Sequence, residues 1–381
     1  MRTTKTLFAA MLCAANLLAA CGGGGGGGGG GDVGAGVPPA PQGPKIFAYV
    51  VNNLNTSGTV SAFSIDPATG ALAGVAGSPF AAEANPNGIA VHPSGKFAYV
   101  VNSVSETVSA YSVDAATGAL SSLGSAVPTA PTFPRYAAVH PSGDFLYVTQ
   151  SSGNSISGYR IASYGSLTSL GAAFASASGN PASQPWALIV APSGRHAYVA
   201  HMGSNEVSAY SIDAATGTWT SLGAPLATGT TPQSMALHPS GKFLYVANQG
   251  SNNVSAYSID GTTGVLTAIG TVAAGAGAIA IAVEPSGKFA YVANFTAGNL
   301  SAFSIDAASG ALTSLGAALA AGAGARAITV EPTGKFVYVA NLVSDDVSAY
   351  SLNPDTGALT SLGARVAAGS TAFDIVTIRT Q

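Results

Sequence analysis

Residues 92–102, His-Pro-Ser-Gly-Lys-Phe-Ala-Tyr-Val-Val-Asn, decide the fold because close copies of this stretch recur along the chain. The copies lie at residues 140–150, 191–201, 238–248, 284–294 and 331–341, and a shortened copy lies at 47–52. The last residue of each copy, usually Asn, falls at positions 52, 102, 150, 201, 248, 294 and 341. A period of this size predicts a repeat protein in which each repeat is one supersecondary unit.

One complete unit predicts four short strands. Residues 89–91 form a first apolar strand, and residues 97–102 and 107–113 alternate as two further strands. A turn at residues 114–118 leads to a fourth strand at 119–124. Residues 45–381 hold seven such units, and each has the length of a propeller blade. The sequence therefore predicts an all-β, seven-bladed β-propeller with four-stranded blades.

Composition agrees with stacked sheets. Only 8% of the residues are charged, 47% are hydrophobic, and 49 are glycine. Both faces of each expected strand carry apolar or small side chains, as expected when every sheet packs between two neighbours.

The two ends of the repeat region predict how the ring closes. Residues 371–379 have the pattern of a first strand, with Phe373 in register with Arg326, but no second strand follows. The first repeat, in contrast, begins at its second strand. We therefore expect the C-terminal strand to complete the N-terminal blade and to remove open sheet edges.

The N-terminus predicts export. Two cations precede an apolar run from Leu7 to Ala20, which is typical of a signal peptide and short for a spanning helix. Residues 18–21, Leu-Ala-Ala-Cys, resemble the lipobox of bacterial lipoproteins, which implies cleavage after residue 20 and a lipid on Cys21. Gly22 in place of Asp implies transport to the outer membrane in that family. The alternative is a soluble secreted protein in which Cys21 is incidental.

Residues 21–44 predict a lipidated cysteine followed by a flexible tether. An unbroken glycine run spans Gly22 to Gly31, and a proline-rich segment follows it. The other cysteine, Cys13, lies in the signal peptide, so the mature chain has no pair for a disulfide. We expect a lipid-anchored protein of the cell envelope, on the periplasmic or surface side of the outer membrane.

The repeat motifs resemble those of lactonase-like seven-bladed propellers with YVTN repeats. Tyr-Val-Ala-Asn stands at residues 245–248, Val-Ser-Ala-Tyr-Ser-Ile-Asp at 207–213, and Thr-Gly-Ala-Leu-Thr at 356–360. The group includes 6-phosphogluconolactonase and fungal muconate-cyclising enzymes, and the resemblance covers residues 45–381. It implies the propeller fold and lactone hydrolysis as a possible activity, although one fold hosts many functions.

Residues in the recurring turns are expected to be structural. His92, His140 and His238 precede Pro in equivalent turns, where other units use Ala or Glu, so we expect them to hold turns on the outer side of the ring. The repeated Asp-x-x-Thr/Ser-Gly turns are read in the same way, since a short acceptor side chain can hold nearby backbone N–H groups.

Residues that differ between units are the candidate site. One slot at the start of each first strand reads Asn87, Arg135, Trp186, Gln233, Ile279, Arg326 and Phe373. We expect these side chains and the ends of the second strands to meet at one mouth of the central channel. The candidate ligand-binding residues are Arg135, Tyr136, Gln150, Trp186, His201, Arg326 and Asp374. Arginine suits carboxylate or phosphate oxygens and aromatic rings suit a sugar or ring face, so a small anionic or sugar-like ligand is expected.

Two alternatives remain open from the sequence. Arg135 and Arg326 could be solvated rim residues, with Trp186 filling the channel. In the lactonases the equivalent blade start resembles Pro-Arg-His, and here it is Pro-Arg-Tyr at residues 134–136. Their Asn-Glu pair is replaced by Gln-Ser at 150–151, so the groups expected to activate water are missing. His201 and Asp374 are the candidate catalytic substitutes.

Other chemistries lack their motifs. There is no HExxH, CxxC, clustered histidine or GxSxG, so no metal or cofactor is expected. A net charge of -3 without basic clusters argues against nucleic acid. The leading interpretation is a non-catalytic lipoprotein that binds a small ligand or a protein partner. The alternative is a periplasmic lactone hydrolase in which Arg135 and Arg326 polarise the carbonyl or bind a carboxylate.

Overall fold

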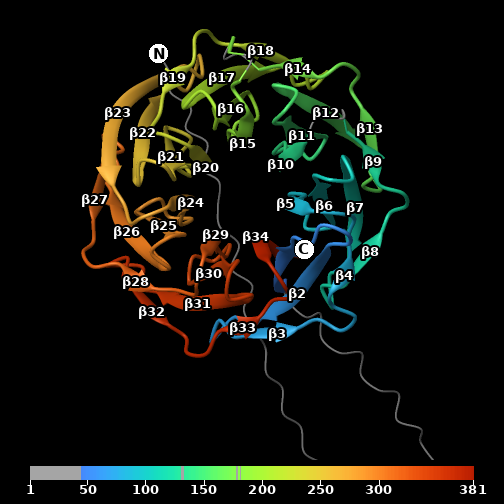
Figure 1. Cartoon of the computed structure of the whole chain (residues 1–381), viewed down its shortest axis with the longest axis vertical. Coiled ribbons are helices and arrows are strands. Elements are labelled where there is room, and N and C mark those ends of the chain that lie inside the picture. Colours follow the sequence, from blue (N-terminus) through green and yellow to red (C-terminus); the bar gives the residue numbers. More distant parts are fainter. Residues whose placement is uncertain (1–43, 130–132, 177–178, 181) are drawn as a thin grey trace, which may run out of the picture. The chain divides into compact units, whose positions relative to one another are not determined.

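The computed structural model describes residues 44–129, 133–176, 179–180 and 182–381. The predicted signal peptide, the lipidated Cys21 and the tether up to residue 43 lie outside the described residues. Seven antiparallel sheets form a closed ring within residues 43–381, as the sequence predicts (Figure 1). No helix in the described part of the chain is long and apolar enough to cross a membrane.

The strands of each blade are ordered from the axis to the rim. The inner strands are β5 (Pro86–Val91), β10 (Pro134–Val139), β15 (Pro185–Val190), β20 (Pro232–Leu237), β24 (Ala278–Val283), β29 (Ala325–Val330) and β34 (Ala372–Arg379). The second strands are β1 (Ile46–Asn52), β6 (Phe97–Asn102), β11 (Phe145–Gln150), β16 (His196–His201), β21 (Phe243–Asn248), β25 (Phe289–Asn294) and β30 (Phe336–Asn341). The third strands are β2 (Thr59–Ile65), β7 (Thr107–Val113), β12 (Ser155–Ile161), β17 (Glu206–Ile212), β22 (Asn253–Ile259), β26 (Asn299–Ile305) and β31 (Asp346–Leu352).

The outermost strands are shorter. They are β3 (Leu72–Gly74), β8 (Leu120–Ser122), β13 (Leu167–Ser169), β18 (Trp219–Ser221), β23 (Leu266–Ala273), β27 (Leu312–Ser314) and β32 (Leu359–Ser361). In six blades a two-residue strand pairs with the start of the third strand: β4 (Phe80–Ala81), β9 (Val127–Pro128), β14 (Phe174–Ala175), β19 (Leu226–Ala227), β28 (Leu319–Ala320) and β33 (Val366–Ala367).

The fourth strand of the second blade differs from the prediction of residues 119–124. Gly124 has a φ of 120°, which takes the chain out of the extended conformation after Ser122. The chain then pairs again at β9. The first strand, in turn, is longer than predicted and begins at Pro86.

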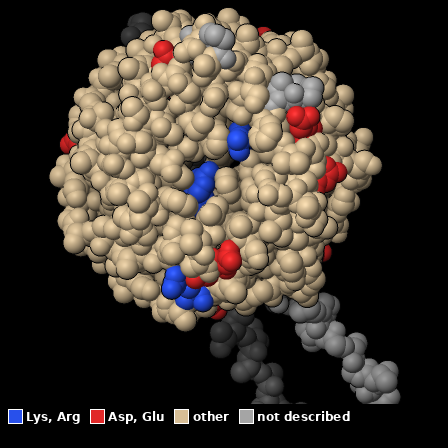
Figure 2. Space-filling model, in the orientation of Figure 1, with Lys and Arg blue, Asp and Glu red and all other residues tan. Residues whose placement is uncertain are grey.

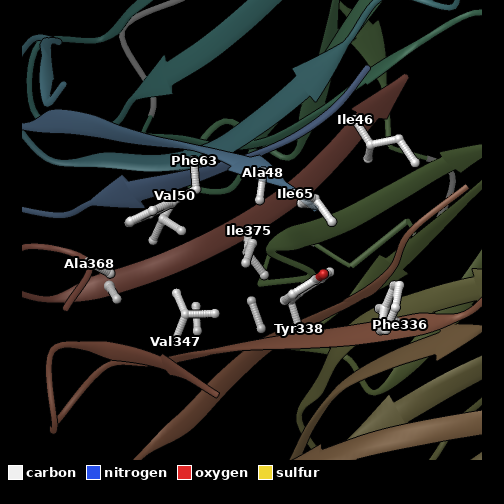
Figure 3. Packing of buried hydrophobic residues seen from close by; sticks show 13 residues of the cluster. Ile46, Ala48, Val50, Phe63, Ile65, Phe336, Tyr338, Val347, Ala368 and Ile375 are labelled. Atoms are coloured by element: carbon white, nitrogen blue, oxygen red, sulfur yellow. The ribbon is translucent and has the colours of Figure 1, made fainter. Parts of the chain in front are cut away.

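The C-terminal strand closes the ring. β34 pairs with β1 along its whole length, from Ile46 opposite Arg379 to Asn52 opposite Ala372. Hydrophobic side chains of this blade pack directly against those of its neighbour, and Figure 3 shows Val50 and Ile375 in one cluster with Tyr338. The predicted closure is therefore confirmed, and the core consists of such clusters between adjacent sheets.

A hydrogen bond between blades explains the conserved spacing within the repeat. The Tyr99 hydroxyl donates to the carbonyl oxygen of Gly165 in the next blade, at 3.0 Å. The other six bonds are Tyr49 to Gly118, Tyr147 to Gly217, Tyr198 to Gly264, Tyr245 to Gly310, Tyr291 to Gly357 and Tyr338 to Gly70. Gly165 has a φ of 89°, and a Cβ there would lie 2.4 Å from the Phe97 ring. Each second strand thus contacts the glycine turn of the next blade with two side chains. One is the Phe or His that begins the strand, and the other is the Tyr.

The repeated histidines also connect blades. His92 accepts the backbone N–H of Ser94 at Nδ1, and its Nε2 donates to the carbonyl of Gly143 in the next blade at 3.0 Å. Their structural role agrees with the prediction. Their predicted position on the outer side of the ring is wrong, because this turn joins the inner strand β5 to β6. It therefore lies near the axis, on the face opposite the start of β5.

The bond between blades predicts the effect of removing one hydroxyl. Tyr198→Phe leaves the buried carbonyl of Gly264 without its partner, so the free energy of unfolding should fall by about 1–3 kcal/mol. Urea unfolding followed by circular dichroism measures this change. Tyr164→Phe is the matched control, since Tyr164 is 68% exposed and should leave stability unchanged. Equal stability of both variants would contradict the structural role of the hydroxyl.

Candidate functional site

Each inner strand begins with a β-bulge. In the second blade Pro86 pairs with Asn102 and Gly88 with Val101, so Asn87 has no partner across the sheet. Every blade has this irregularity, and the bulge residues are Asn87, Arg135, Trp186, Gln233, Ile279, Arg326 and Phe373. A bulge redirects the side chain that it carries. We call these seven residues, with Tyr136 and Asp374 beside them, the mouth.

Two arginines from distant blades each lie over an aromatic ring at the mouth. The guanidinium carbon of Arg135 lies 4.3 Å from the Trp186 ring centroid, and that of Arg326 lies 4.2 Å from the Phe373 ring centroid. Burial, and then the charge of Arg326, lower the pKa of Arg135 to about 10. Figure 2 shows basic side chains at a hollow in the centre of a face that is otherwise mostly uncharged. The mouth is therefore a confined positive site.

Several polar atoms of the mouth are buried without a hydrogen-bond partner in the described structure. They are Arg135 Nε, Trp186 Nε1, Gln233 Oε1 and Arg326 Nη1. Buried polar groups in proteins are normally paired, because an unpaired one has lost its water without compensation. Six other buried polar atoms of the described chain, such as Trp219 Nε1, also lack a partner, but these four gather on the side chains of the mouth. Three donors and one acceptor are thus positioned for a polar ligand.

Asp374 and Tyr136 complete the mouth. Asp374 Oδ2 accepts the backbone N–H of Ile89 at 3.1 Å, and Oδ1 accepts the N–H of Ile375 at 2.9 Å. Burial raises the pKa of Asp374 to about 6, although these two hydrogen bonds and the charge of Arg326 oppose the shift. Burial and the charge of Asp374 raise the pKa of Tyr136 to about 12, while Arg326 lowers it. Tyr136 is thus a neutral hydrogen-bond donor at ordinary pH.

Thr149 is a residue that the sequence reasoning missed. Its hydroxyl accepts the N–H of Tyr136 at 3.1 Å and donates to the carbonyl of Trp186 at 2.8 Å. Here the bulge is wider than elsewhere, since no residue between Pro134 and Ala137 pairs across the sheet. The equivalent position is Val or Ala in the other blades: Val51, Val101, Ala200, Ala247, Ala293 and Ala340. The sequence signal that could have identified Thr149 is a hydroxyl side chain at a repeat position that is apolar in every other blade.

Two candidates are not part of this cluster. His201 is fully buried, with Nε2 2.8 Å from Ser208 Oγ and Nδ1 3.3 Å from Ser176 Oγ. Burial lowers its pKa to about 4, so the ring is neutral. Gln150 Nε2 likewise donates to Ser157 Oγ at 3.1 Å.

Both side chains repeat the contact that Asn102 makes with Ser109 on its own third strand. The second-strand ends therefore lie at the predicted end of the ring, but these side chains bond toward the third strand. A ligand-binding role for Gln150 and His201 stays a prediction that this geometry does not support.

The described residues contain no group of three or more His, Cys, Asp or Glu side chains that could hold a metal ion. Guanidinium groups can bind an oxyanion or polarise a carbonyl, aromatic rings can contact a sugar face, and Asp374 can exchange a proton near neutral pH.

Comparisons with solved structures agree with the fold. A candidate 6-phosphogluconolactonase from Bacteroides fragilis has a TM-score of 0.77 at 23% identity, covering 89% of this chain and 99% of its own. The periplasmic gluconolactonase of Pseudomonas aeruginosa has a TM-score of 0.71 at 22% identity, covering 87% and 99%. Hydrazine synthase of Kuenenia stuttgartiensis also matches, with a TM-score of 0.58 at 18% identity, covering 80% and 95%. At these identities the likeness shows the fold alone.

A search of curated proteins gives no match. The family model described as lactonase, 7-bladed beta-propeller matches residues 42–182, 134–278 and 271–374, which together span nearly all of the described chain. The chain therefore belongs to the lactonase family of seven-bladed β-propellers.

Proposed function

We propose that this protein hydrolyses a sugar lactone at the mouth. The observation that carries the proposal is a pair of guanidinium groups, those of the half-buried Arg135 and the buried Arg326, each with a buried N–H that has no partner in the described structure. Hydrolysis of a lactone builds negative charge on the carbonyl oxygen. Preorganised donors in a site shielded from water stabilise such an oxyanion far better than water does.

The neighbouring bulge residues support a polyhydroxylated substrate. The unpartnered N–H of Trp186 can donate a hydrogen bond to one sugar hydroxyl, and the unpartnered carbonyl oxygen of Gln233 can accept a hydrogen bond from another. The Gln233 amide is held in place, since its nitrogen donates to Gln249 Oε1 at 3.1 Å. The names of two similar structures, a gluconolactonase and a candidate 6-phosphogluconolactonase, both refer to sugar lactones.

Family membership favours this hydrolase over the non-catalytic binding or scaffolding module that was the leading interpretation of the sequence. The missing histidine and glutamate had argued against catalysis. That argument is weaker once Asp374 is found beside Arg326 and Tyr136, because a carboxyl group is then available at the mouth.

The proposal predicts turnover that depends on both arginines. The parent protein should open D-glucono-1,5-lactone faster than buffer measured in parallel. Arg135→Ala and Arg326→Ala should each lower kcat/KM by about 100-fold or more, as removal of an oxyanion donor does. Arg365→Ala is the control, because Arg365 is exposed and pairs only with Asp346 among the described carboxylates. Turnover no faster than buffer, or arginine variants as active as the parent, would overturn the proposal.

We propose further that the enzyme acts at the cell envelope, anchored through a lipid on Cys21. The support is the lipobox-like Leu-Ala-Ala-Cys at residues 18–21 and the glycine run that follows. In the propeller itself, β1 begins at Ile46, opposite Arg379 and thus at the far end of the sheet from the mouth residue Asp374. The first described strand therefore begins on the face of the propeller opposite the mouth.

The anchor has its own test. Metabolic labelling with a palmitate analogue should mark the parent protein, and Cys21→Ser should abolish the label, since residue 21 is the only cysteine after the signal peptide. Cys13→Ser is the control and should keep the label. Persistent labelling of Cys21→Ser would contradict lipidation at this residue.

A further inference from the structure

The carboxyl group of Asp374 is not required by the fold. Its equivalents on the other six inner strands are Gly88, Tyr136, Ala187, Ser234, Ala280 and Ala327. Asp374 does make a structural contact across the closing junction, since it accepts the N–H of Ile89. Ser234 makes the same contact with Ile281 in another blade, at 3.4 Å. A neutral acceptor can therefore make this contact, and blades with Gly or Ala at the position do without a side-chain acceptor.

The surroundings of Asp374 belong to the mouth. The charge of Arg326 on β29 lowers the pKa of Asp374, and the charge of Asp374 raises the pKa of Tyr136 on β10. The charge of Arg326 also lowers the pKa of Arg135 on β10. The neighbouring inner strand β5 carries no titratable residue. On β1, Tyr49 is bonded to Gly118 of the next blade. Asp374 is thus a buried carboxyl group, 7% exposed, and it directly follows Phe373, whose ring centroid lies 4.2 Å from the guanidinium carbon of Arg326.

The other titratable candidates are unsuited to take a proton from water. Tyr136 is already protonated at neutral pH, because its pKa is raised to about 12. His201 is hydrogen-bonded at both ring nitrogens, and burial lowers its pKa to about 4. A carboxyl group whose pKa is raised to about 6 is ionised at neutral pH and is a much better base than an ordinary aspartate.

We propose that Asp374, on the closing strand β34, is the general base of the lactone hydrolysis, so that the last strand of the chain supplies a catalytic group to arginines from β10 and β29. This inference rests on the proposed function. Asp374 takes a proton from water as the water oxygen bonds to the lactone carbonyl carbon. The carbonyl electron pair moves to its oxygen, which the guanidinium groups stabilise.

Collapse of this intermediate completes the reaction. The C=O bond re-forms, and the bond between the carbonyl carbon and the ring oxygen breaks. The ring oxygen then receives the proton held by Asp374 and leaves as a hydroxyl of the open-chain hydroxy acid. Water is the only co-reactant, and Asp374 ends as the carboxylate that it was at the start.

The pH dependence follows from the direction of the pKa shift. The base acts only when ionised, so kcat/KM should fall as the pH drops below about 6. The contribution of Asp374 to the stability of the fold changes with pH in the opposite direction. Because folding raises the pKa of Asp374, this residue stabilises the fold where it is protonated, and that contribution is lost as the pH rises through about 6.

Two substitutions test the base without removing the acceptor for the Ile89 N–H. Asp374→Asn keeps a carbonyl oxygen as the acceptor. Asp374→Ser introduces a hydroxyl at this position, as Ser234 does in another blade. Both should lower kcat by about 100-fold or more with little change in KM, as loss of a general base does. The residual activity should also lose its acidic limb near pH 6. Calorimetric binding of D-gluconate should be retained or tighter, because a negative charge has been removed from the mouth.

The outcomes separate this inference from the proposed function. If the parent hydrolyses the lactone and both variants keep its kcat and its acidic limb, Asp374 is not the base and the hydrolase proposal stands. If the parent shows no turnover, both proposals are overturned. If His201→Asn loses kcat and the Asp374 variants do not, the base is His201 and the inference is wrong.

Discussion

The hydrogen bond from each second-strand tyrosine to a glycine carbonyl of the next blade is the interaction on which the ring depends. It occurs in all seven blades, and the bond from Tyr338 to Gly70 joins the last blade to the first. The same glycine packs against the aromatic ring that begins the strand. Neither cysteine lies in residues 45–381, so the ring is held by these bonds and by the apolar clusters between sheets.

Because repeated residues hold the scaffold, the bulge positions are free to differ between blades. A bulge lifts its residue out of the cross-strand pairing, so its identity has little effect on the sheet. Arg135, Trp186 and Arg326 use this freedom to place polar groups on the axis. Asp374 shows how the closure contributes, since β34 delivers it to a mouth that is built mainly by other blades. Scaffold and site are therefore separable, and the same ring can carry different chemistry.

Much of this organisation could be predicted from the sequence. The period equates residues of different blades, so the position of Arg326 and Arg135 in one ring follows from alignment of the repeats. The widened bulge could not be predicted, because it depends on where the hydroxyl of Thr149 bonds. The orientation of His201 was also inaccessible, since it is set by a serine on the third strand. In both cases a side-chain hydrogen bond, which the sequence does not display, decides the result.

A crystal structure of the protein with D-gluconate or an unreactive lactam analogue tests the central claim most directly. We expect the carboxylate or carbonyl oxygen within hydrogen-bond distance of Arg135 and Arg326, with the sugar hydroxyls on Trp186 and Gln233 and the reacting carbon facing Asp374. Ligand bound only in a groove between blades at the rim, such as the one lined by Leu300, Leu315 and Leu359, would contradict this account.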